Sequence, residues 1–274
     1  MTAVAVLGSA TNTTNVELVR SWREHGLDGE LISQLDVGSL DPETTIIGRL
    51  DVLPTLDGVE PGLATLLSLE RRGGRILNRA YALAAAHDKL LTARQLERAG
   101  LPHPRTGAFR AGQPSPLEPP LVLKPRLGSW GRDVFRCRDW AELEGTLAIV
   151  RGRSWFHRHG TLVQELVPSP GYDLRLVVAG GEVIAASERV AAPGDWRTNV
   201  SLGGSLRPAE PSADARALAV AAAAALGADL VGVDLMPTAS GYLVLELNGA
   251  VDFDQRYSLD GDVYLAAASA LGLR

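Results

Sequence analysis

Three side chains near the end of the chain have the types and spacing of a metal site. Residues 231–248 read VGVDLMPTASGYLVLELN, which predicts two strands joined by a turn. Glu246 and Asn248 are two positions apart and therefore share a face of the second strand, while Asp234 lies in the first strand. Buried carboxylates require a partner, and a Mg²⁺ ion bound through oxygen atoms is one such partner. An edge hairpin that keeps these groups in water is the other interpretation.

A lysine precedes a glycine-rich loop in the middle of the chain. Residues 121–124 (LVLK) form an apolar strand that ends in Lys124, and Gly128 and Gly131 follow. A partly buried ammonium beside such a loop suits a phosphate group, because the loop backbone can close over the bound anion. A surface lysine ahead of an ordinary hairpin turn accounts for the same pattern.

Charged residues recur in the hairpin predicted at residues 172–189. Asp173 and Arg175 share one face of its first strand, and Glu188 and Arg189 come from the second. Two arginines near an acidic metal site can neutralise a triphosphate or a substrate carboxylate, for which the planar guanidinium is well shaped. An exposed ladder of cross-strand ion pairs is the alternative.

Two further segments are candidates for contact with a nucleotide. The strand ending at residues 164–167 turns at Pro168, which leaves backbone groups unpaired that can read an adenine edge. A strand that simply ends at a proline loop explains this equally well. Residues 194–204 have no strand or helix pattern, and Arg197 and Asn199 within this loop can contact a γ-phosphate.

The elements that must position these side chains begin with a small α/β unit. An apolar strand, a polar turn and a helix open the chain, in the order typical of a parallel α/β domain. The turn GSATNTTN matches neither glycine-rich phosphate pattern, so its phosphate signal is set aside. The predicted elements of this unit are strands at 3–7, 44–50 and 75–78 and helices at 16–25 and 63–71.

The remainder of the chain mixes strands and helices. Asp88, Asp139 and Ser212 are suited to capping the starts of three helices. The predicted helices are at 89–99, 139–150, 212–227 and 263–271, and the predicted strands are at 121–124, 133–137, 161–167, 172–179, 182–189 and in the two halves of 231–248.

Composition excludes several classes of protein. The 274 residues carry a net charge of −5, which disfavours a nucleic-acid partner. The single cysteine, Cys137, excludes an internal disulfide and a cysteine-cluster metal site. No apolar run is long enough for a membrane span, and the N-terminus lacks the pattern of a signal peptide. We therefore expect a soluble cytoplasmic protein, and no serine or cysteine nucleophile is apparent.

The order of these pieces resembles a known family. Along the chain they read HDK, LVLKPRLGSWGR, QELVPSPGYDLR, ERV, GDWRTNVSLGG, GVDLM and LELN. This series resembles the ATP-grasp superfamily, and within it the RimK-like carboxylate–amine ligases, over nearly the whole chain. GDWRTNVSLGG is similar to the RimK-type glutamate ligases. KPRLGSWGR and QELVPSPGYD look more like the LysX/ArgX-type ligases, which attach an amino acid to the C-terminal glutamate of an acidic amino-group carrier protein.

The resemblance implies a fold and a role for each candidate residue. The fold is α/β (α+β), with an N-terminal pre-ATP-grasp domain at 1–86, a lid subdomain at 87–168 and a C-terminal subdomain at 169–274, the nucleotide lying between the last two. The implied ATP-binding residues are Lys89 and Lys124 at the phosphates, Gly128, Ser129, Trp130 and Gly131 in a lid that extends to Arg132, Glu165 and Leu166 at the adenine, Asp173 at the ribose, and Arg197, Thr198 and Asn199 at the phosphates. Mg²⁺, or Mn²⁺ in its place, is held by Asp234, Glu246 and Asn248, and Arg175 and Arg189 lie near the reacting acyl group together with Arg197 and Asn199.

The implied reaction is an ATP-dependent ligation. A substrate carboxylate takes the γ-phosphate to give an acyl phosphate, and an amine then displaces that phosphate to form an amide. The implied partners are ATP, an amino acid and a carrier protein or peptide tail, and the implied assembly is a homo-oligomer. A glutamate ligase acting on a protein tail or cofactor is an alternative, and a nucleotide-binding scaffold without catalysis is a second.

The chain departs from the family pattern on the substrate side. After Asn248 it reads GAVDFDQRY, whereas RimK-type members have a small residue followed by Pro-Gly. The pair Asp252-Phe253 resembles the acidic-aromatic pair of LysX-type members. We therefore expect Gly249, Asp252 and Phe253 to carry substrate choice.

Overall fold

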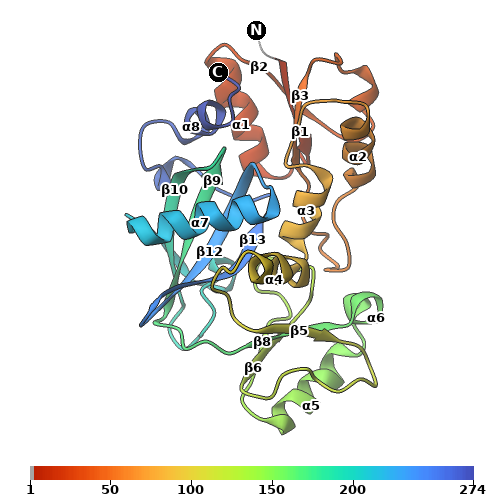
Figure 1. Ribbon diagram of the computed structural model, residues 1–274, viewed down its shortest axis with the longest axis vertical. Helices are drawn as coiled ribbons and strands as arrows, with labels where there is room; N and C mark the ends of the chain where they lie inside the picture. The colour runs from red at the N-terminus through yellow and green to blue at the C-terminus, as the bar shows by residue number, and fades with distance from the viewer. Residues whose placement is uncertain (1–2) are drawn as a thin grey trace.

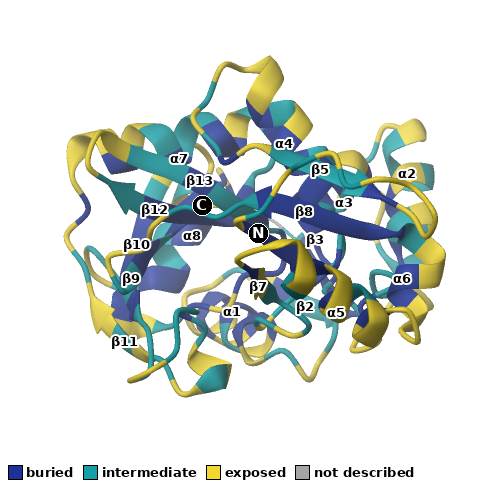
Figure 2. Cartoon of the chain, turned by 90° about the horizontal axis from the view of Figure 1, so that it is seen from below, coloured by how far each residue is buried: buried dark blue, intermediate teal, exposed yellow. Residues whose placement is uncertain are grey.

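The computed structural model describes residues 3–274, which form three β-sheets with helices packed around them (Figure 1). The mixed α/β class predicted from the sequence is confirmed. The N-terminal sheet lies at one end of the elongated molecule, the lid sheet with α5 (Trp140–Val150) and α6 (Ser154–His159) lies at the other, and the C-terminal sheet lies between them. In Figure 2 the central strands are buried, whereas α5 and α2 present exposed outer faces.

The N-terminal sheet is parallel, with the strand order β2-β1-β3-β4. Alternate residues of β1 enter different cores: Val4 and Val6 pack with α1, whereas Ala5 and Leu7 pack with α2 and α3. Asn12 caps α1 by accepting the N–H of Asn15. The elements are β1 (Ala3–Gly8), α1 (Thr13–Glu24), β2 (Asp28–Ile32), η1 (Val37–Ser39), β3 (Thr45–Arg49), α2 (Leu63–Arg71), β4 (Ile76–Leu77) and α3 (Ala80–His87).

The lid sheet is antiparallel, with the strand order β5-β8-β6-β7. Asp88 caps α4 and Asp139 caps α5, as the sequence predicts. The elements are α4 (Lys89–Arg98), β5 (Thr106–Phe109), β6 (Leu121–Lys124), β7 (Phe135–Cys137), α5 (Trp140–Val150), α6 (Ser154–His159) and β8 (Thr161–Glu165).

The C-terminal sheet is antiparallel, with the strand order β11-β10-β9-β12-β13. Leu174, Leu176 and Val178 of β9 pack against α7. Asp173 and Arg175 alternate with them along the strand and therefore project from the opposite face. The elements are β9 (Tyr172–Ala179), β10 (Glu182–Val190), η2 (Val200–Leu202), β11 (Ser205–Pro208), α7 (Ala213–Leu226), β12 (Leu230–Thr238), β13 (Gly241–Asn248), η3 (Gln255–Tyr257) and α8 (Val263–Ala270).

The structure contains elements that were not predicted from the sequence, and the bounds of others differ from the prediction. Strands β2, β5 and β11 and helices α3 and α6 were not predicted, and α1 begins at Thr13 rather than at residue 16. The expected domain boundaries at 86/87 and 168/169 fall between sheets, at the end of α3 and in the loop before β9. Among residues 3–274, no helix is long and apolar enough to cross a membrane.

Candidate active site

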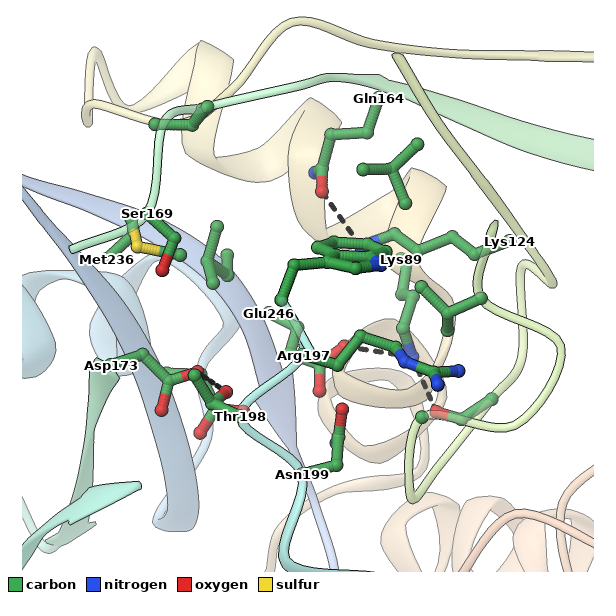
Figure 3. Close-up of a pocket in the computed structure, with 18 of the residues that line it drawn as sticks. Lys89, Lys124, Gln164, Ser169, Asp173, Arg197, Thr198, Asn199, Met236 and Glu246 are labelled. Atoms are coloured by element: carbon green, nitrogen blue, oxygen red, sulfur yellow. Dashed lines mark hydrogen bonds and ion pairs between the residues drawn. The ribbon is translucent and has the colours of Figure 1, made fainter. Parts of the chain in front are cut away.

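A narrow cavity lies between the lid sheet and the C-terminal sheet. Figure 3 shows Lys89, Lys124 and Glu246 lining it, with Asp173 and Thr198 across from them. Its free volume is about 130 Å³, less than the roughly 300 Å³ of small-ligand pockets. We therefore expect the lid to move outward before a nucleotide enters.

Two buried lysines lie at the lid side of this cavity. The ammonium of Lys89 donates to the carbonyl of Gly128 at 2.5 Å and lies 3.2 Å from the carboxylate of Glu246. Lys124 donates to the side-chain oxygen of Gln164 at 2.8 Å. Burial lowers the pKa of Lys124 to about 8. Both ammonium groups have their present partners within the protein.

Asp173, Asp234 and Arg189 form a buried charged network at the floor of the cavity. Asp234 is fully buried and receives two hydrogen bonds from Arg175, at 2.8 and 2.9 Å, and an ion pair from Arg189 at 2.8 Å. Burial by itself would raise the pKa of Asp234, but the two guanidinium groups outweigh it and hold that pKa below its ordinary value. The guanidinium of Arg189 also donates to both carboxylate oxygens of Asp173, each at 2.7 Å.

Asp173 anchors the loop after β10. Its carboxylate accepts the hydroxyl of Thr198 at 2.6 Å in addition to the guanidinium of Arg189. The carboxylate expected near the ribose thus has its present hydrogen bonds with protein groups, although Asp173 lines the cavity. Through Thr198 it fixes the position of the neighbouring Arg197 and Asn199, which line the same cavity.

The residues expected to hold a metal are brought together by the pairing of β12 with β13. Asp234 lies directly opposite Glu246, and the side-chain amide of Asn248 lies 3.5 Å from the carboxylate of Asp234. Residues 3–274 contain no cluster of three or more histidine, cysteine, aspartate or glutamate side chains suited to a metal. Two carboxylates and an amide fit Mg²⁺, because this ion takes one or two carboxylates and completes its shell with phosphate and water oxygens.

The glycine loop closes onto the loop that contains Asn199. A Cβ atom added to Gly131, whose φ is +68°, would lie 2.5 Å from the side-chain oxygen of Asn199. The hydroxyl of Ser201 donates to the carbonyl of Trp130 at 2.7 Å. Gly128, Ser129 and Gly131 line the narrow cavity, whereas Trp130 is 46 % exposed and lines the neighbouring one.

The guanidinium of Arg197 is turned toward its own loop. It pairs with Asp195 at 2.9 Å, and this contact holds the pKa of Asp195 at about 2. A phosphate that binds Arg197 must therefore share it with Asp195.

The far end of the cavity is lined by apolar side chains and backbone. The prediction of unpaired backbone is wrong for two groups: the N–H of Glu165 donates to the carbonyl of Arg105 at 2.9 Å, and that of Leu166 donates to Pro120 at 3.4 Å. Sequence reasoning assigned no role to Gln164 or Met236, which also line this cavity. The alternation that placed Asp234 on the cavity face places Met236 there as well.

A second, wider cavity of about 1180 Å³ adjoins the first. Four residues line both cavities: Ser129, Arg189, Asn199 and Glu246. Two of the residues expected to carry substrate choice, Asp252 and Phe253, line the second cavity. Gly249 lies instead against α3, where an added Cβ atom would come within 2.4 Å of Leu83.

The polar turn after β1 forms part of the wall of the second cavity. Ser9, Thr11, Asn12 and Thr14 all line it. The sequence offered this turn only as a phosphate loop, and that signal was set aside. Its contacts with residues about 240 positions away could not be read from local pattern.

Comparison with known proteins identifies the family. Residues 86–266 match the RimK-like ATP-grasp domain. A "Probable alpha-L-glutamate ligase" of Shewanella loihica is 30% identical over 270 residues, covering 90% of this chain and 87% of the relative. The chain therefore belongs to the RimK-like ATP-grasp family.

Solved structures show the same fold. D-alanine–D-alanine ligase from Bacillus anthracis, complexed with ATP, superposes with a TM-score of 0.69 at 17% identity, covering 100% of this chain and 93% of the other. The ATP-grasp ligase PsnB, complexed with a minimal precursor, Mg and ADP, has a TM-score of 0.64 at 17% identity, covering 98% and 97%. Family and fold together make this chain an ATP-dependent carboxylate–amine ligase. The finer likeness to LysX/ArgX-type ligases stays a prediction.

Proposed function

We propose that the protein joins an amino acid, with L-glutamate as the first candidate, to a carboxylate at the end of a peptide or protein tail. The observation that carries this proposal is the wall shared by the two cavities. Ser129, Arg189, Asn199 and Glu246 line both of them, so a γ-phosphate in the narrow cavity would meet a substrate carboxylate in the wide one.

The charges at this wall suit an acyl-phosphate reaction. A carboxylate oxygen bonds to the γ-phosphorus while the bond to ADP breaks, and negative charge gathers on the transferred group. Arg189 lies in the wall, and Lys89 lies beside Glu246 in the same cavity, so both can neutralise that charge. The amine then bonds to the acyl carbon, phosphate leaves, and the amine proton passes to solvent. Positioning and charge neutralisation account for the chemistry without a covalent enzyme intermediate.

Asp234, Glu246 and Asn248 would hold Mg²⁺ in this proposal. When bound, the ion would supply positive charge that offsets the negative charge of the phosphate groups. Asp234 would orient Arg175 and Arg189 at the same time, because both guanidinium groups already contact it.

The size of the wide cavity supports a tail as the acceptor. At about 1180 Å³ it exceeds the roughly 300–1,000 Å³ typical of a site for one small ligand. It can hold the end of a peptide together with a free amino acid. PsnB, of the same fold, is complexed with a precursor, and L-glutamate is suggested by the name of the Shewanella relative.

The LysX-type function is kept as a second candidate because Asp252 and Phe253, which resemble the acidic-aromatic pair of LysX-type ligases, line the wide cavity. In that case the tail belongs to a small acidic carrier protein and ends in glutamate. A nucleotide-binding scaffold would need neither the paired cavities nor the residues that they share.

A coupled assay of ADP release tests the proposal. Purified protein is given Mg-ATP, one amino acid from a complete panel, and peptides that end in glutamate, in glutamine or in an amide. We expect ADP release and a mass increase of one amino-acid residue only with a free terminal carboxylate. Release of ADP without a mass increase would point to hydrolysis of the acyl phosphate, and no release with any pair would contradict the proposed substrates. Light scattering of the same sample tests the expected homo-oligomer.

A further inference from the structure

The segment expected to carry substrate choice is held by the N-terminal domain. Val251, Asp252 and Phe253 follow β13 and line the wide cavity. Each of the three is contacted by a different residue of the first 49. The contacts join parts of the chain that lie about 200 to 240 positions apart.

Thr14 holds Phe253 through two hydrogen bonds. Its hydroxyl donates to the carbonyl of Phe253 at 3.1 Å and accepts the N–H of Phe253 at 3.1 Å. A hydroxyl has one proton to donate, so that proton is committed to the segment. Thr14 is 4 % exposed, and its hydroxyl therefore serves the backbone of Phe253 before any substrate.

Asn12 holds the side chain of Asp252. Its amide donates to the carboxylate of Asp252 at 3.0 Å, while its oxygen accepts the N–H of Asn15 at the start of α1. The residue that caps α1 therefore also holds the carboxylate of Asp252, which lines the wide cavity.

Arg49 holds Val251, the remaining residue of the segment. It is fully buried, donates to the carbonyl of Val251 at 2.7 Å and to the side chain of Asn15 at 2.6 Å, and lies 5.8 Å from the ring centre of Phe253. Its planar fork holds these two partners in one fixed geometry, which the compact ammonium of a lysine does not reproduce. A buried cation with these contacts fixes both the segment and the turn after β1.

We infer that Arg49, Thr14 and Asn12 are positioning residues that set the affinity for the acceptor-side substrates by fixing residues 251–253. The inference rests on the proposed function, because it assigns the wide cavity to those substrates. It follows that the N-terminal domain shapes substrate choice, whereas nucleotide binding depends on the lid and the C-terminal sheet. Changes at these three residues should therefore separate the two properties.

The test compares Thr14→Val, which keeps the shape and removes the hydroxyl, with Thr14→Ser, which keeps the hydroxyl. Thr45→Val is the matched control, because Thr45 is a threonine of the same domain that is 1 % exposed and lies on β3 away from the segment. KM is measured for L-glutamate and for a glutamate-ended peptide. The Kd of ADP is measured by calorimetry, and the backbone exchange of Phe253 by mass spectrometry.

We expect Thr14→Val to raise KM for at least one of the two substrates about tenfold, the equivalent of one well-formed hydrogen bond. The N–H of Phe253 should exchange faster, while the Kd of ADP stays unchanged. Thr14→Ser should restore wild-type values, and Thr45→Val should change none of them. Arg49→Lys, as a second variant, should act in the same direction as Thr14→Val.

Two results would overturn the inference. One is unchanged exchange at Phe253 in Thr14→Val, and the other is a loss of ADP affinity that matches the change in KM. If the wild-type protein turns over neither substrate, the proposed substrates are wrong. The exchange of Phe253 and the Kd of ADP then still decide whether Thr14 fixes the segment independently of the nucleotide site.

Discussion

Glu246 is one of the residues that the two cavities share. It lines both, lies opposite Asp234 and pairs with Lys89 at 3.2 Å. Glu246→Gln keeps the shape and removes the charge that a metal and Lys89 both require. We expect the rate of ADP formation to fall by roughly 10²–10³-fold, the cost of losing one electrostatic group at a reacting phosphate. The measurement is a coupled ADP assay at saturating substrates.

The matching control is Glu142→Gln on the exposed side of the lid. Glu142 pairs with Arg138 on the surface of α5 and lines neither of the two cavities described above. ADP formation in this variant should equal that of the wild type. Activity of Glu246→Gln within a few-fold of wild type, at any Mg²⁺ concentration, would remove Glu246 from the metal site.

We expect Lys124 to make nucleotide binding sensitive to pH. Burial lowers its pKa from 10.5 to about 8 in the folded protein without nucleotide. Because the folded state holds this proton less tightly than the unfolded state, the penalty of burying the charge is relieved, and stability rises, as pH increases from about 8 to 10.5. A bound polyphosphate favours the charged form and raises the pKa again.

We therefore expect ADP binding at pH 8.5–9 to take up a proton through Lys124. Calorimetry in two buffers with different ionisation enthalpies measures this uptake directly. Lys124→Arg keeps a charge that does not titrate in this range, and it should abolish the uptake. Equal uptake in Lys124→Arg and the wild type would place the titrating group elsewhere.

The residue scale also shows what the sequence could predict. The positions of Asp234, Glu246 and Asn248 followed from the alternation of a strand, and the structure places them together. The pairing of Asp234 with both Arg175 and Arg189 could not be predicted, because it depends on which strands are neighbours. The role of Thr14 and Asn12 was hidden for the same reason.

At the scale of elements, the small volume of the narrow cavity leads us to expect that the lid moves when a nucleotide enters. The loop at residues 128–131 touches Asn199 through Gly131 and Ser201 through the carbonyl of Trp130. Since the cavity behind it has only about 130 Å³ of free volume, we expect these contacts to open and re-form during each turnover. Trp130 lies at the moving edge, so its fluorescence should report the closure when Mg-ATP is added.

Gly131→Ala tests the closed contact. The residue has a φ of +68°, and its new Cβ atom would meet Asn199 at 2.5 Å. Left-handed backbone costs about 1–2 kcal/mol in a residue with a side chain, which corresponds to roughly a tenfold loss of the closed state. We expect kcat to fall by that factor and the Trp130 response to shrink, both measured by stopped-flow fluorescence.

Gly145→Ala provides the control on the same subdomain. Gly145 lies in α5, and an added Cβ atom there meets nothing within 4 Å. Alanine stabilises a helix interior by up to about 1 kcal/mol relative to glycine, so this variant should be at least as stable as the wild type, with an unchanged kcat. An unchanged kcat in Gly131→Ala as well would show that closure of this loop does not limit turnover.

Elements with strong local patterns were predicted, and those that depend on their neighbours were not. Helix α7 had a cap at Ser212 and a terminating Gly227, and both were read from the sequence. Five of the eight residues of helix α3 are alanine and most of the helix is buried, so it shows no polar face that would mark it as a helix. Strand β11 is four residues long and mostly exposed, which leaves little pattern to read.

At the scale of the whole molecule, Asn78 ties the N-terminal sheet to the C-terminal sheet. Its amide group donates to the carbonyls of Gly48 and Leu230, at 3.1 and 2.7 Å, and its oxygen accepts the N–H groups of Asp229 and Leu230, at 2.8 and 2.9 Å. The side chain is buried, and all of its hydrogen-bonding capacity is used. Because residues of both domains line the wide cavity, this link also holds that cavity together.

Asn78→Asp should weaken this link between the two sheets. The carboxylate keeps the acceptor side but points a buried negative charge at the two carbonyls that the amide served, which we expect to cost about 3–5 kcal/mol of unfolding free energy. Asn78→Gly separates the backbone from the side chain, since Asn78 has a φ of +52° that glycine adopts freely. Urea unfolding followed by hydrogen exchange in β1 and β12 should show the two sheets exchanging together in the wild type. In Asn78→Asp the N-terminal sheet should exchange first. Simultaneous exchange in both variants, with unfolding free energies within about 1 kcal/mol of wild type, would show that packing alone joins the two domains.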